Sequence, residues 1–328
     1  MNAVVVNKSK FDTFKWLLKR EFWENRGGFL WSQLITGAVV AGLTLIGAVL
    51  GGVKINGHFV DDFHDVDTEA GAHAIGQFIE GVVSMGMGIS LLVLTFVVFF
   101  YTLGALFDER KDRSVLFWKS MPVSDAATVL SKLAWALLLA PLLAILLGAV
   151  LGLVLWLIAA LGIAISGLGM VGFTAMFTDA HVFRLIGSGI AALPVYVAWA
   201  LPTVGWLLFV SSWARSKPFL WAVLVPVLGC ASISLISLIL GLDLPLKELW
   251  STIVGRGLGS AVPGIWSLWY GHDAIVTGDA KTSIIGLYNF VAHSWHAFSL
   301  LNTWIGAVVG AGFIFAAIHL RRWRELAD

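Results

Sequence analysis

The sequence predicts an all-α polytopic membrane protein with six transmembrane helices. Of its 328 residues, 59% are hydrophobic and 12% are charged, whereas a typical soluble domain is about half apolar and about a quarter charged. So few charges do not cover a water-facing surface of this size. The second observation is a series of apolar stretches long enough to cross a hydrocarbon layer about 30 Å thick. The composition argues against a soluble enzyme, a disordered protein and a nucleic-acid binder.

Six stretches contain the roughly 20 mainly apolar residues that a transmembrane helix needs. They lie at 29–52, 84–106, 133–163, 185–213, 218–241 and 297–319. Most charged residues fall between these stretches, in segments that are predicted to lie outside the membrane. The chain is therefore expected to form one transmembrane domain over residues 1–328.

The third stretch is long enough for two helices, because no charged residue occurs between Lys132 and Asp179. Basic residues accumulate in short loops on the cytoplasmic side of a membrane. With six spans and a cytoplasmic amino terminus, most of the 21 Lys and Arg residues fall on that side. A seventh span would move Arg215, Lys217 and the basic carboxyl terminus outside. We therefore predict one span at 133–163, with both termini in the cytoplasm.

Residues 1–28 are expected to include an amphipathic helix in the cytoplasmic interface of the membrane. The segment 8–26 places Phe11, Phe14, Trp16, Leu17, Leu18, Phe22 and Trp23 among Lys10, Lys15, Lys19 and Arg20. On a helix the apolar side chains gather on one side and the bases on the other, which is typical of interfacial helices. A solvated tail is the alternative. The apolar runs are too short for a cleavable signal peptide.

Two further segments are predicted on the outer side without crossing. The glycine-rich run 166–177 is expected to be a connection or an interfacial helix. The segment 242–296 holds apolar patches at 261–270 and 284–292, which are too short to span. Patches of this kind commonly dip into the membrane and return. Short membrane-dipping helices are therefore expected before the last span.

The most informative stretch is the charged loop 107–132, between the second and third spans. Its order of polar and then apolar residues predicts a short helix that begins at Arg113-Ser114 and is ended by Pro122. The exposed face of this helix is expected to carry Val115, Phe117, Trp118 and Met121. Aromatic side chains exposed to water are costly, so we expect the helix to dock into a partner.

This loop resembles the one that follows the second span in permease subunits of ATP-binding cassette transporters of the type-two exporter class. That family carries Glu-Arg, then a Gly-Thr or Gly-Ser step, a leucine-rich turn, and Pro-Val-Ser thirteen residues after the Glu. Glu109-Arg110 and Pro122-Val123-Ser124 stand at this spacing, with Ser114 at the Thr or Ser position. Arg113 departs from the pattern, because glycine is usual there. The predicted layout of spans and outer segments resembles the family over nearly the whole chain.

The resemblance implies that residues 109–124 form a coupling helix in a groove of a separate ATPase subunit. It assigns to this contact Glu109, Arg110, Arg113, Ser114, Phe117, Trp118, Pro122, Val123 and Ser124. Glu109, Arg110 and Arg113 would make ion pairs at the rim, and Phe117, Trp118 and Pro122 would supply the buried contact. The ATPase would bind ATP and Mg. A second permease, identical or paralogous, would complete a dimer in a bacterial inner membrane, in contact with lipid.

The chain itself is expected to have no catalytic residue, cofactor or metal. The phosphate loop GxxxxGK[ST] and the motifs HExxH and GxSxG are absent from the sequence. A single cysteine, Cys230, excludes an intramolecular disulfide. Charges are nearly absent from the predicted spans, which argues against an ion or proton carrier. A lipid-like, amphipathic or peptide cargo fits such an apolar path better.

Two other functions remain open from the sequence. Outer histidines and carboxylates, among them His272, His293 and Asp61, are candidate catalysts for a membrane-embedded enzyme that acts on a lipid or sugar-lipid, or candidate metal ligands. The charged loop is alternatively the recruiting element of a non-transporting anchor or sensor. Replacement of Phe117 and Trp118 by alanine distinguishes the exporter from the enzyme. The exporter is expected to bind its ATPase more weakly, whereas the enzyme is expected to be unaffected.

Overall fold

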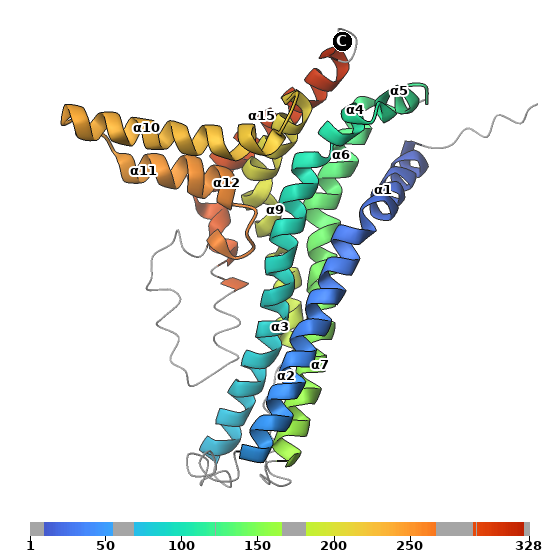
Figure 1. Ribbon diagram of the computed structural model, residues 1–328, viewed down its shortest axis with the longest axis vertical. Coiled ribbons are helices and arrows are strands. Elements are labelled where there is room, and N and C mark those ends of the chain that lie inside the picture. Colours follow the sequence, from blue (N-terminus) through green and yellow to red (C-terminus); the bar gives the residue numbers. More distant parts are fainter. Residues whose placement is uncertain are drawn as a thin grey trace, which may run out of the picture.

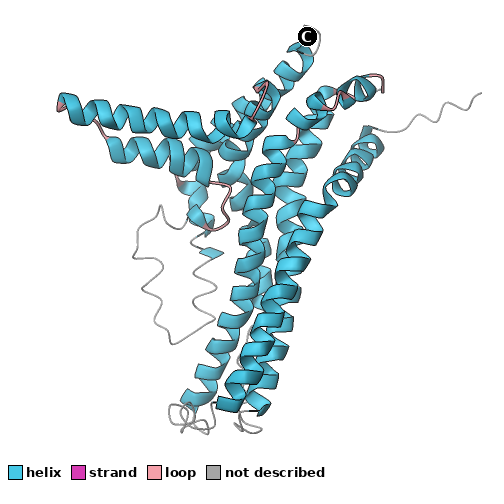
Figure 2. Ribbon diagram, in the orientation of Figure 1, coloured by secondary structure: helices cyan, strands magenta, loops and turns pink. Residues whose placement is uncertain are grey.

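The computed structural model describes residues 10–54, 69–121, 123–165, 182–266, 291–292 and 294–324. Within these ranges the chain is helical and contains no strand (Figure 2). Six helices in them are long and apolar enough to cross a membrane, by length and composition. They cover Phe11–Leu50, Glu80–Lys111, Asp125–Gly162, Leu185–Trp213, Leu220–Leu240 and Leu301–Trp323. For the described residues, the prediction of an all-α fold with six such helices is confirmed.

The amino-terminal half is built from long helices joined by π-helical turns. α1 (Lys10–Arg26) continues through η1 (Gly27–Trp31) into α2 (Ser32–Lys54). α3 (Glu69–Gly104) is followed by the short helices α4 (Phe107–Lys111) and α5 (Ser114–Lys119). α6 (Asp125–Ala134), η4 (Trp135–Leu139) and α7 (Ala140–Ile165) form the third long segment. A continuous helical segment thus covers the predicted third span, and the run 166–177 lies outside the described residues.

The carboxyl-terminal half begins with α9 (Val182–Trp213). η5 (Leu220–Leu224) and α10 (Val225–Leu240) follow, and the chain returns through α11 (Leu246–Trp250), η6 (Ser251–Arg256) and α12 (Gly257–Gly259). The short turn η8 (Ala297–Ser299) leads into α15 (Leu301–Arg324). Most of the two patches that were predicted to dip into the membrane lies outside the described residues.

The long helices pack into one elongated bundle. α2, α3 and α7 run side by side, and α9 packs against α15 and α3 (Figure 1). The main apolar core lies between α3, η4 and α9, with Leu94, Val98, Trp135, Val195 and Trp199 among its buried members. Lipid tails are as apolar as these side chains, so close packing stabilises such contacts more than removal from water does.

A buried polar contact ties the three bundle helices together. The Ser90 hydroxyl of α3 donates to the Ala144 carbonyl of α7 at 2.7 Å, and the Gln33 amide of α2 donates to the Ser90 carbonyl at 3.0 Å. Hydrogen bonds of this kind join helices in membranes, where water does not compete for the same groups.

α9 and α15 meet at bare backbone. A Cβ on Gly310 of α15 would lie 2.5 Å from the Leu201 carbonyl oxygen of α9, and a Cβ on Gly205 would lie 2.5 Å from the Gly310 carbonyl oxygen. Such spacing requires residues without side chains at both positions. The crossing brings the last long helix against the middle of α9.

α10 extends away from this bundle. Figure 1 shows it running across the direction of α2, α3 and α7, with α11 beside it. Leu235, Leu238 and Ile239 on α10 are strongly exposed. The predicted fifth span is therefore a helix of sufficient length and apolarity, and most of its apolar surface faces outward from the single chain.

α1 exposes aromatic side chains and buries a charge. Phe11, Trp16 and Trp23 are more than half exposed, whereas Leu17 and Glu21 are buried. The predicted pattern of bases and apolar residues did not include a buried glutamate. The placement of α1 in a membrane interface remains a prediction.

Candidate functional site

The charged loop between α3 and α6 folds against the end of α9. The backbone N–H groups of Leu106 and Phe107 both donate to the Ser211 hydroxyl of α9, each at 3.0 Å. Arg110 donates through Nη2 to the carbonyl oxygens of Ser211 and Ala214, at 2.6 Å and 2.9 Å. The last carbonyls of a helix have no partner within it and carry the negative end of its dipole. Arg110 therefore caps α9 from within the chain.

A backbone break at Arg113 separates α4 from α5. Arg113 has φ of +53°, in the left-handed region that costs roughly 1–2 kcal/mol for a residue with a side chain. The structure thus has two short helices in the segment 109–124, which the family resemblance implies to be one coupling helix. α5 begins at Ser114, the predicted start, and ends at Lys119. Pro122, the predicted end, lies outside the described residues.

α5 presents one strongly exposed aromatic side chain. Phe117 is 57% exposed, and Met121 beyond the helix is exposed as well. The Trp118 ring meets Phe117 edge-on at 5.1 Å, and the Arg20 guanidinium lies 4.0 Å from its centroid. Val115 was predicted to be exposed, but it is only 4% exposed. The exposed apolar surface is therefore smaller than predicted and centres on Phe117.

A cleft of about 770 Å³ separates this surface from α1 and α3. Its apolar lining includes Phe96, Phe100, Phe117 and Trp118, and its acidic lining includes Glu24, Asp108, Glu109 and Asp112. Phe117 thus lines a cleft that also contains other aromatic side chains and carboxylates.

Buried charges fix the base of α4. Glu21 of α1 accepts hydrogen bonds from the Tyr101 hydroxyl of α3 at 2.8 Å and from Lys132 Nζ of α6 at 3.0 Å. Arg20 Nη2 donates to the same carboxylate at 2.7 Å. A carboxylate without exposure to water is stable only when it is paired in this way. Glu21 therefore joins α1, α3 and α6.

Glu109 of α4 is the centre of the same set of charges. Its Oε1 lies 2.9 Å from Lys132 Nζ and 3.0 Å from Arg20 Nη2, and its Oε2 accepts from Arg321 Nη1 of α15 at 2.7 Å. Arg321 Nε also lies 3.3 Å from Asp125 Oδ1 at the start of α6. Glu109 thus contacts α1, α6 and α15 directly.

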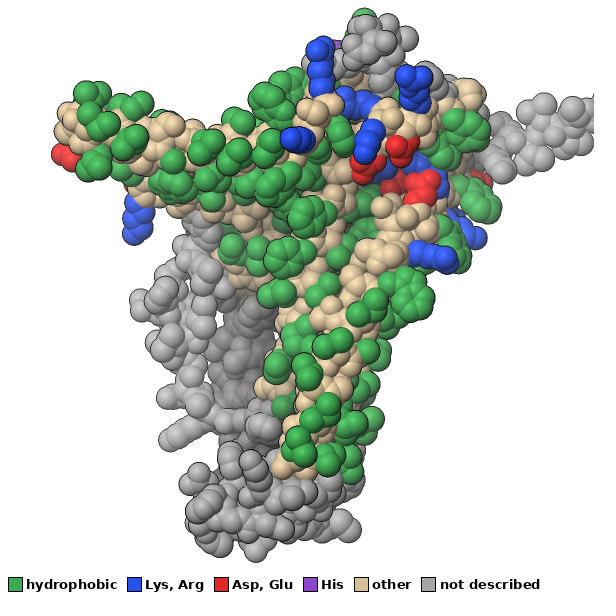
Figure 3. Space-filling model, in the orientation of Figure 1, with side chains coloured by type: hydrophobic (Ala, Val, Ile, Leu, Met, Phe, Trp, Pro, Cys, Tyr) green, Lys and Arg blue, Asp and Glu red, His purple; other side chains and the backbone are tan. Residues whose placement is uncertain are grey.

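We call these six residues the charge cluster: Arg20, Glu21, Glu109, Asp125, Lys132 and Arg321. Figure 3 shows charged side chains gathered at the end of the molecule that carries α4 and α5, above an apolar flank. Each carboxylate is matched by cations at short range. The ion pairs connect α4 with α1, α6 and α15.

The remaining predicted docking residues shape the loop. The Ser114 hydroxyl donates to the Glu109 carbonyl at 3.2 Å. The Ser124 hydroxyl accepts a hydrogen bond from the first turn of α6, which is the role of a helix N-cap. Val123 is half-buried beside it.

Sequence reasoning placed Glu109 and Arg110 at the rim of a partner contact, whereas the structure engages both within the chain. It did not single out Glu21, Lys132 or Arg321 as site residues. Glu21 and Arg321 lie in runs of charged residues, but for Lys132 a usable signal existed, because it is an isolated charge at the border of an apolar stretch. Such a charge is expensive unless it is paired.

No group of three His, Cys, Asp or Glu side chains suited to a metal ion occurs among the residues that the structure places. His272, His293 and Asp61, considered from the sequence for an enzyme or a metal site, fall outside those residues.

Comparisons of the chain with protein-family models, with curated proteins and with solved structures find no match. The six apolar helices, the exposed Phe117 and the charge cluster are the observations that bear on function.

Proposed function

We propose that the chain is the membrane-spanning permease subunit of an ATP-driven exporter of the ATP-binding cassette type, coupled to a separate ATPase subunit. The observation that carries the proposal is Phe117, which is 57% exposed on a helix pair whose base is held by Glu109 and Arg110. Large side chains that are held in position commonly supply much of the binding energy of a protein–protein contact. The resemblance of the loop to the family's coupling helix supports an ATPase as the partner.

In this proposal α4 and α5 lie in the cytoplasm and transmit the movement of the ATPase. ATP and Mg bind on the partner, so hydrolysis belongs to that subunit. Glu109 contacts α1, α6 and α15, and Arg110 caps α9. A displacement of α4 therefore reaches four long helical segments together. ATP drives transport only if the spans bind cargo with different affinity in their two conformations.

The same proposal accounts for the exposed apolar surfaces. Phe11, Trp16 and Trp23 on α1 suit the cytoplasmic interface of a bacterial inner membrane. The outward face of α10 suits lipid or a second permease. The cargo is lipid-like, amphipathic or peptide in character, because the long helices carry few charges.

The proposal is tested by purifying the tagged chain in a gentle detergent after expression with its chromosomal neighbours. Mass spectrometry identifies the partners, and phosphate release measures ATP hydrolysis. We expect an ATPase in about equal amount and ATP turnover by the complex. A chain that purifies alone, with no ATPase activity, overturns the proposal.

The role of α5 is tested in the same preparation. Phe117→Ala combined with Trp118→Ala is expected to weaken the association. Phe183→Ala is the matched control, because Phe183 is 86% exposed at the opposite end of α9 from the Arg110 cap. Equal recovery of the ATPase with both variants removes the docking role of α5. Recovery of a partner without ATPase activity favours a non-transporting anchor instead.

A further inference from the structure

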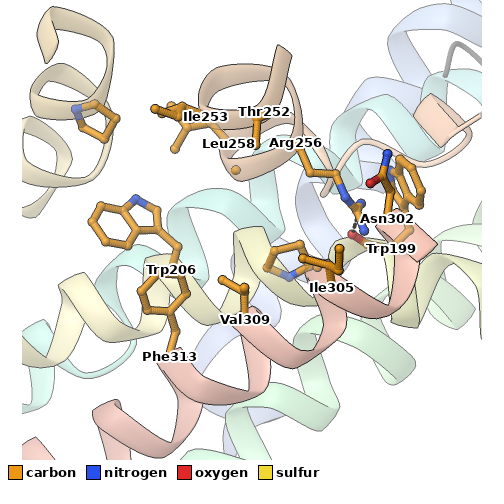
Figure 4. Close-up of a pocket in the computed structure, with 14 residues that line it drawn as sticks. Trp199, Trp206, Thr252, Ile253, Arg256, Leu258, Asn302, Ile305, Val309 and Phe313 are labelled. Atoms are coloured by element: carbon orange, nitrogen blue, oxygen red, sulfur yellow. Dashed lines mark hydrogen bonds between the residues drawn. The ribbon is translucent and has the colours of Figure 1, made fainter. Parts of the chain in front are cut away.

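A cavity of about 380 Å³ lies between α9, α10, α15 and the returning segment of η6 and α12 (Figure 4). Its lining is mainly apolar and includes Trp206, Ile253, Ile305, Val309 and Phe313. None of its lining residues belongs to the charge cluster. Small-molecule sites in proteins commonly enclose about 300–1,000 Å³, so the volume suits a small ligand.

The charged residue in this lining is Arg256, at the end of η6. It is 8% exposed. Its Nη1 donates to the Trp199 carbonyl of α9 at 2.7 Å, and its guanidinium lies 3.5 Å from the centroid of the Trp199 ring. A Cβ on Gly306 of α15 would lie 2.5 Å from Nη2. The guanidinium is therefore seated between the ring of α9 and the bare backbone of α15.

The backbone around Arg256 is also in contact with α9. The Thr203 hydroxyl of α9 donates to the Arg256 carbonyl at 3.4 Å, and it lies 2.7 Å from the Ser260 hydroxyl. Thr203 and Ser260 are both fully buried. A cation held in this way is preorganised, so little ordering remains to be done when a ligand binds.

The two ends of the cavity differ in polarity. Figure 4 shows Arg256 and Asn302 at one end and Trp206 and Phe313 at the other. Val309, between them on α15, is about half exposed. The lining of the cavity is therefore exposed at the surface along α15. An ionisable residue placed among membrane-spanning helices commonly marks a substrate path.

We propose that this cavity binds an anionic amphiphile, with its head group at Arg256 and its hydrocarbon chain beside Trp206 and Phe313. The inference rests on the proposed export function and narrows its cargo to anionic amphiphiles that enter from the membrane. Guanidinium groups form strong charge-assisted hydrogen bonds with both carboxylate and phosphate oxygens. A free fatty acid and an anionic phospholipid therefore share the chemistry that the site recognises.

The test is ligand retention by the purified full chain, measured by native mass spectrometry in a neutral detergent without ATPase or nucleotide. The probes share oleoyl chains: phosphatidylglycerol against phosphatidylcholine, and oleate against oleyl alcohol. Arg256→Gln removes the charge in the cavity. Lys247→Gln is the matched control, because it removes the same charge from an exposed position on α11.

We expect the unaltered chain and Lys247→Gln to retain an anionic probe about tenfold better than its neutral counterpart, and Arg256→Gln to lose this preference. A preference within the phospholipid pair identifies a bilayer lipid, and one within the oleate pair identifies a free single-chain amphiphile. Either supports the proposal. Equal retention of anionic and neutral probes by the unaltered chain, or the same preference in both Gln variants, overturns it.

A second variant keeps the test decisive if Arg256→Gln does not fold. Val309→Trp fills the cavity and leaves the arginine in place, so it is expected to lower retention of the anionic probes. Undiminished retention overturns the assignment to this cavity. The retention assay contains no ATPase, so its result does not depend on whether the chain is an exporter. Failure of the cavity proposal is therefore distinguishable from failure of the export proposal.

Discussion

Replacement of Glu109 by glutamine tests whether the charge cluster holds α4 in place. Glu109→Gln keeps the shape of the side chain and removes its negative charge. Lys132, Arg20 and Arg321 then each lose a carboxylate contact of 2.7–3.0 Å, in surroundings where Lys132 and Arg321 are almost fully buried. Removing one partner of a buried ion pair costs about 3–5 kcal/mol.

The cations are not left without carboxylates in this variant. Glu21 still contacts Lys132 and Arg20, and Asp125 still contacts Arg321. The expected loss in the free energy of unfolding therefore lies at the lower end of that range, about 3 kcal/mol. For a chain of this size such a loss lowers Tm by about 4 °C.

Thermal unfolding of the purified chain in one detergent, followed by tryptophan fluorescence, measures this loss. Glu24→Gln is the matched control, because it makes the same chemical change in a side chain that is 49% exposed and lies 3.4 Å from Arg20 Nε. An exposed pair contributes about 0–1 kcal/mol. If the two variants unfold at the same temperature, the reasoning about the cluster is refuted.

Three further predictions use the same unfolding assay. Arg113→Gly is expected to raise the free energy of unfolding by about 0.5–1 kcal/mol, because glycine relieves the left-handed backbone at the cost of some chain entropy; a loss of stability would contradict the strain. Ser124→Ala is expected to lower it by about 1 kcal/mol through loss of the α6 N-cap, and an unchanged Tm would argue against that cap. Gly310→Val is expected to cost at least about 1–3 kcal/mol, because it forces α15 away from α9. Gly312→Val is its control, with no atom near the added Cβ, and equal losses would rule out the close crossing.

The helices themselves could be predicted from the sequence, because a bilayer requires long apolar stretches whatever packs around them. The positions of the six helices therefore follow closely from composition. The direction of α10 does not, since it depends on contacts with α11 and η6 rather than on its own residues. The length of an apolar stretch indicates that its helix can cross a membrane. It does not determine the angle at which the helix leaves the bundle.

The ion pairs of the charge cluster could not be predicted from the sequence. Glu21 and Lys132 are 111 positions apart, and Glu109 and Arg321 are 212 positions apart. No local pattern encodes such pairings, which arise when α1, α6 and α15 pack around α4. The wrong prediction that Val115 is exposed could have been avoided. Residues i and i+2 of a helix do not share a face, so Val115 and Phe117 are not both expected on the exposed face, and Phe117 is the exposed one.

Cross-linking from position 117 tests the central claim most directly. A photoreactive phenylalanine analogue replaces Phe117 in one variant and Phe183 in another, and each chain is irradiated in membranes that also contain the neighbouring gene products. The account predicts an adduct with the ATPase from position 117 and none from position 183. Recovery of the ATPase with the chain but no adduct from position 117, or equal adducts from both positions, would contradict it.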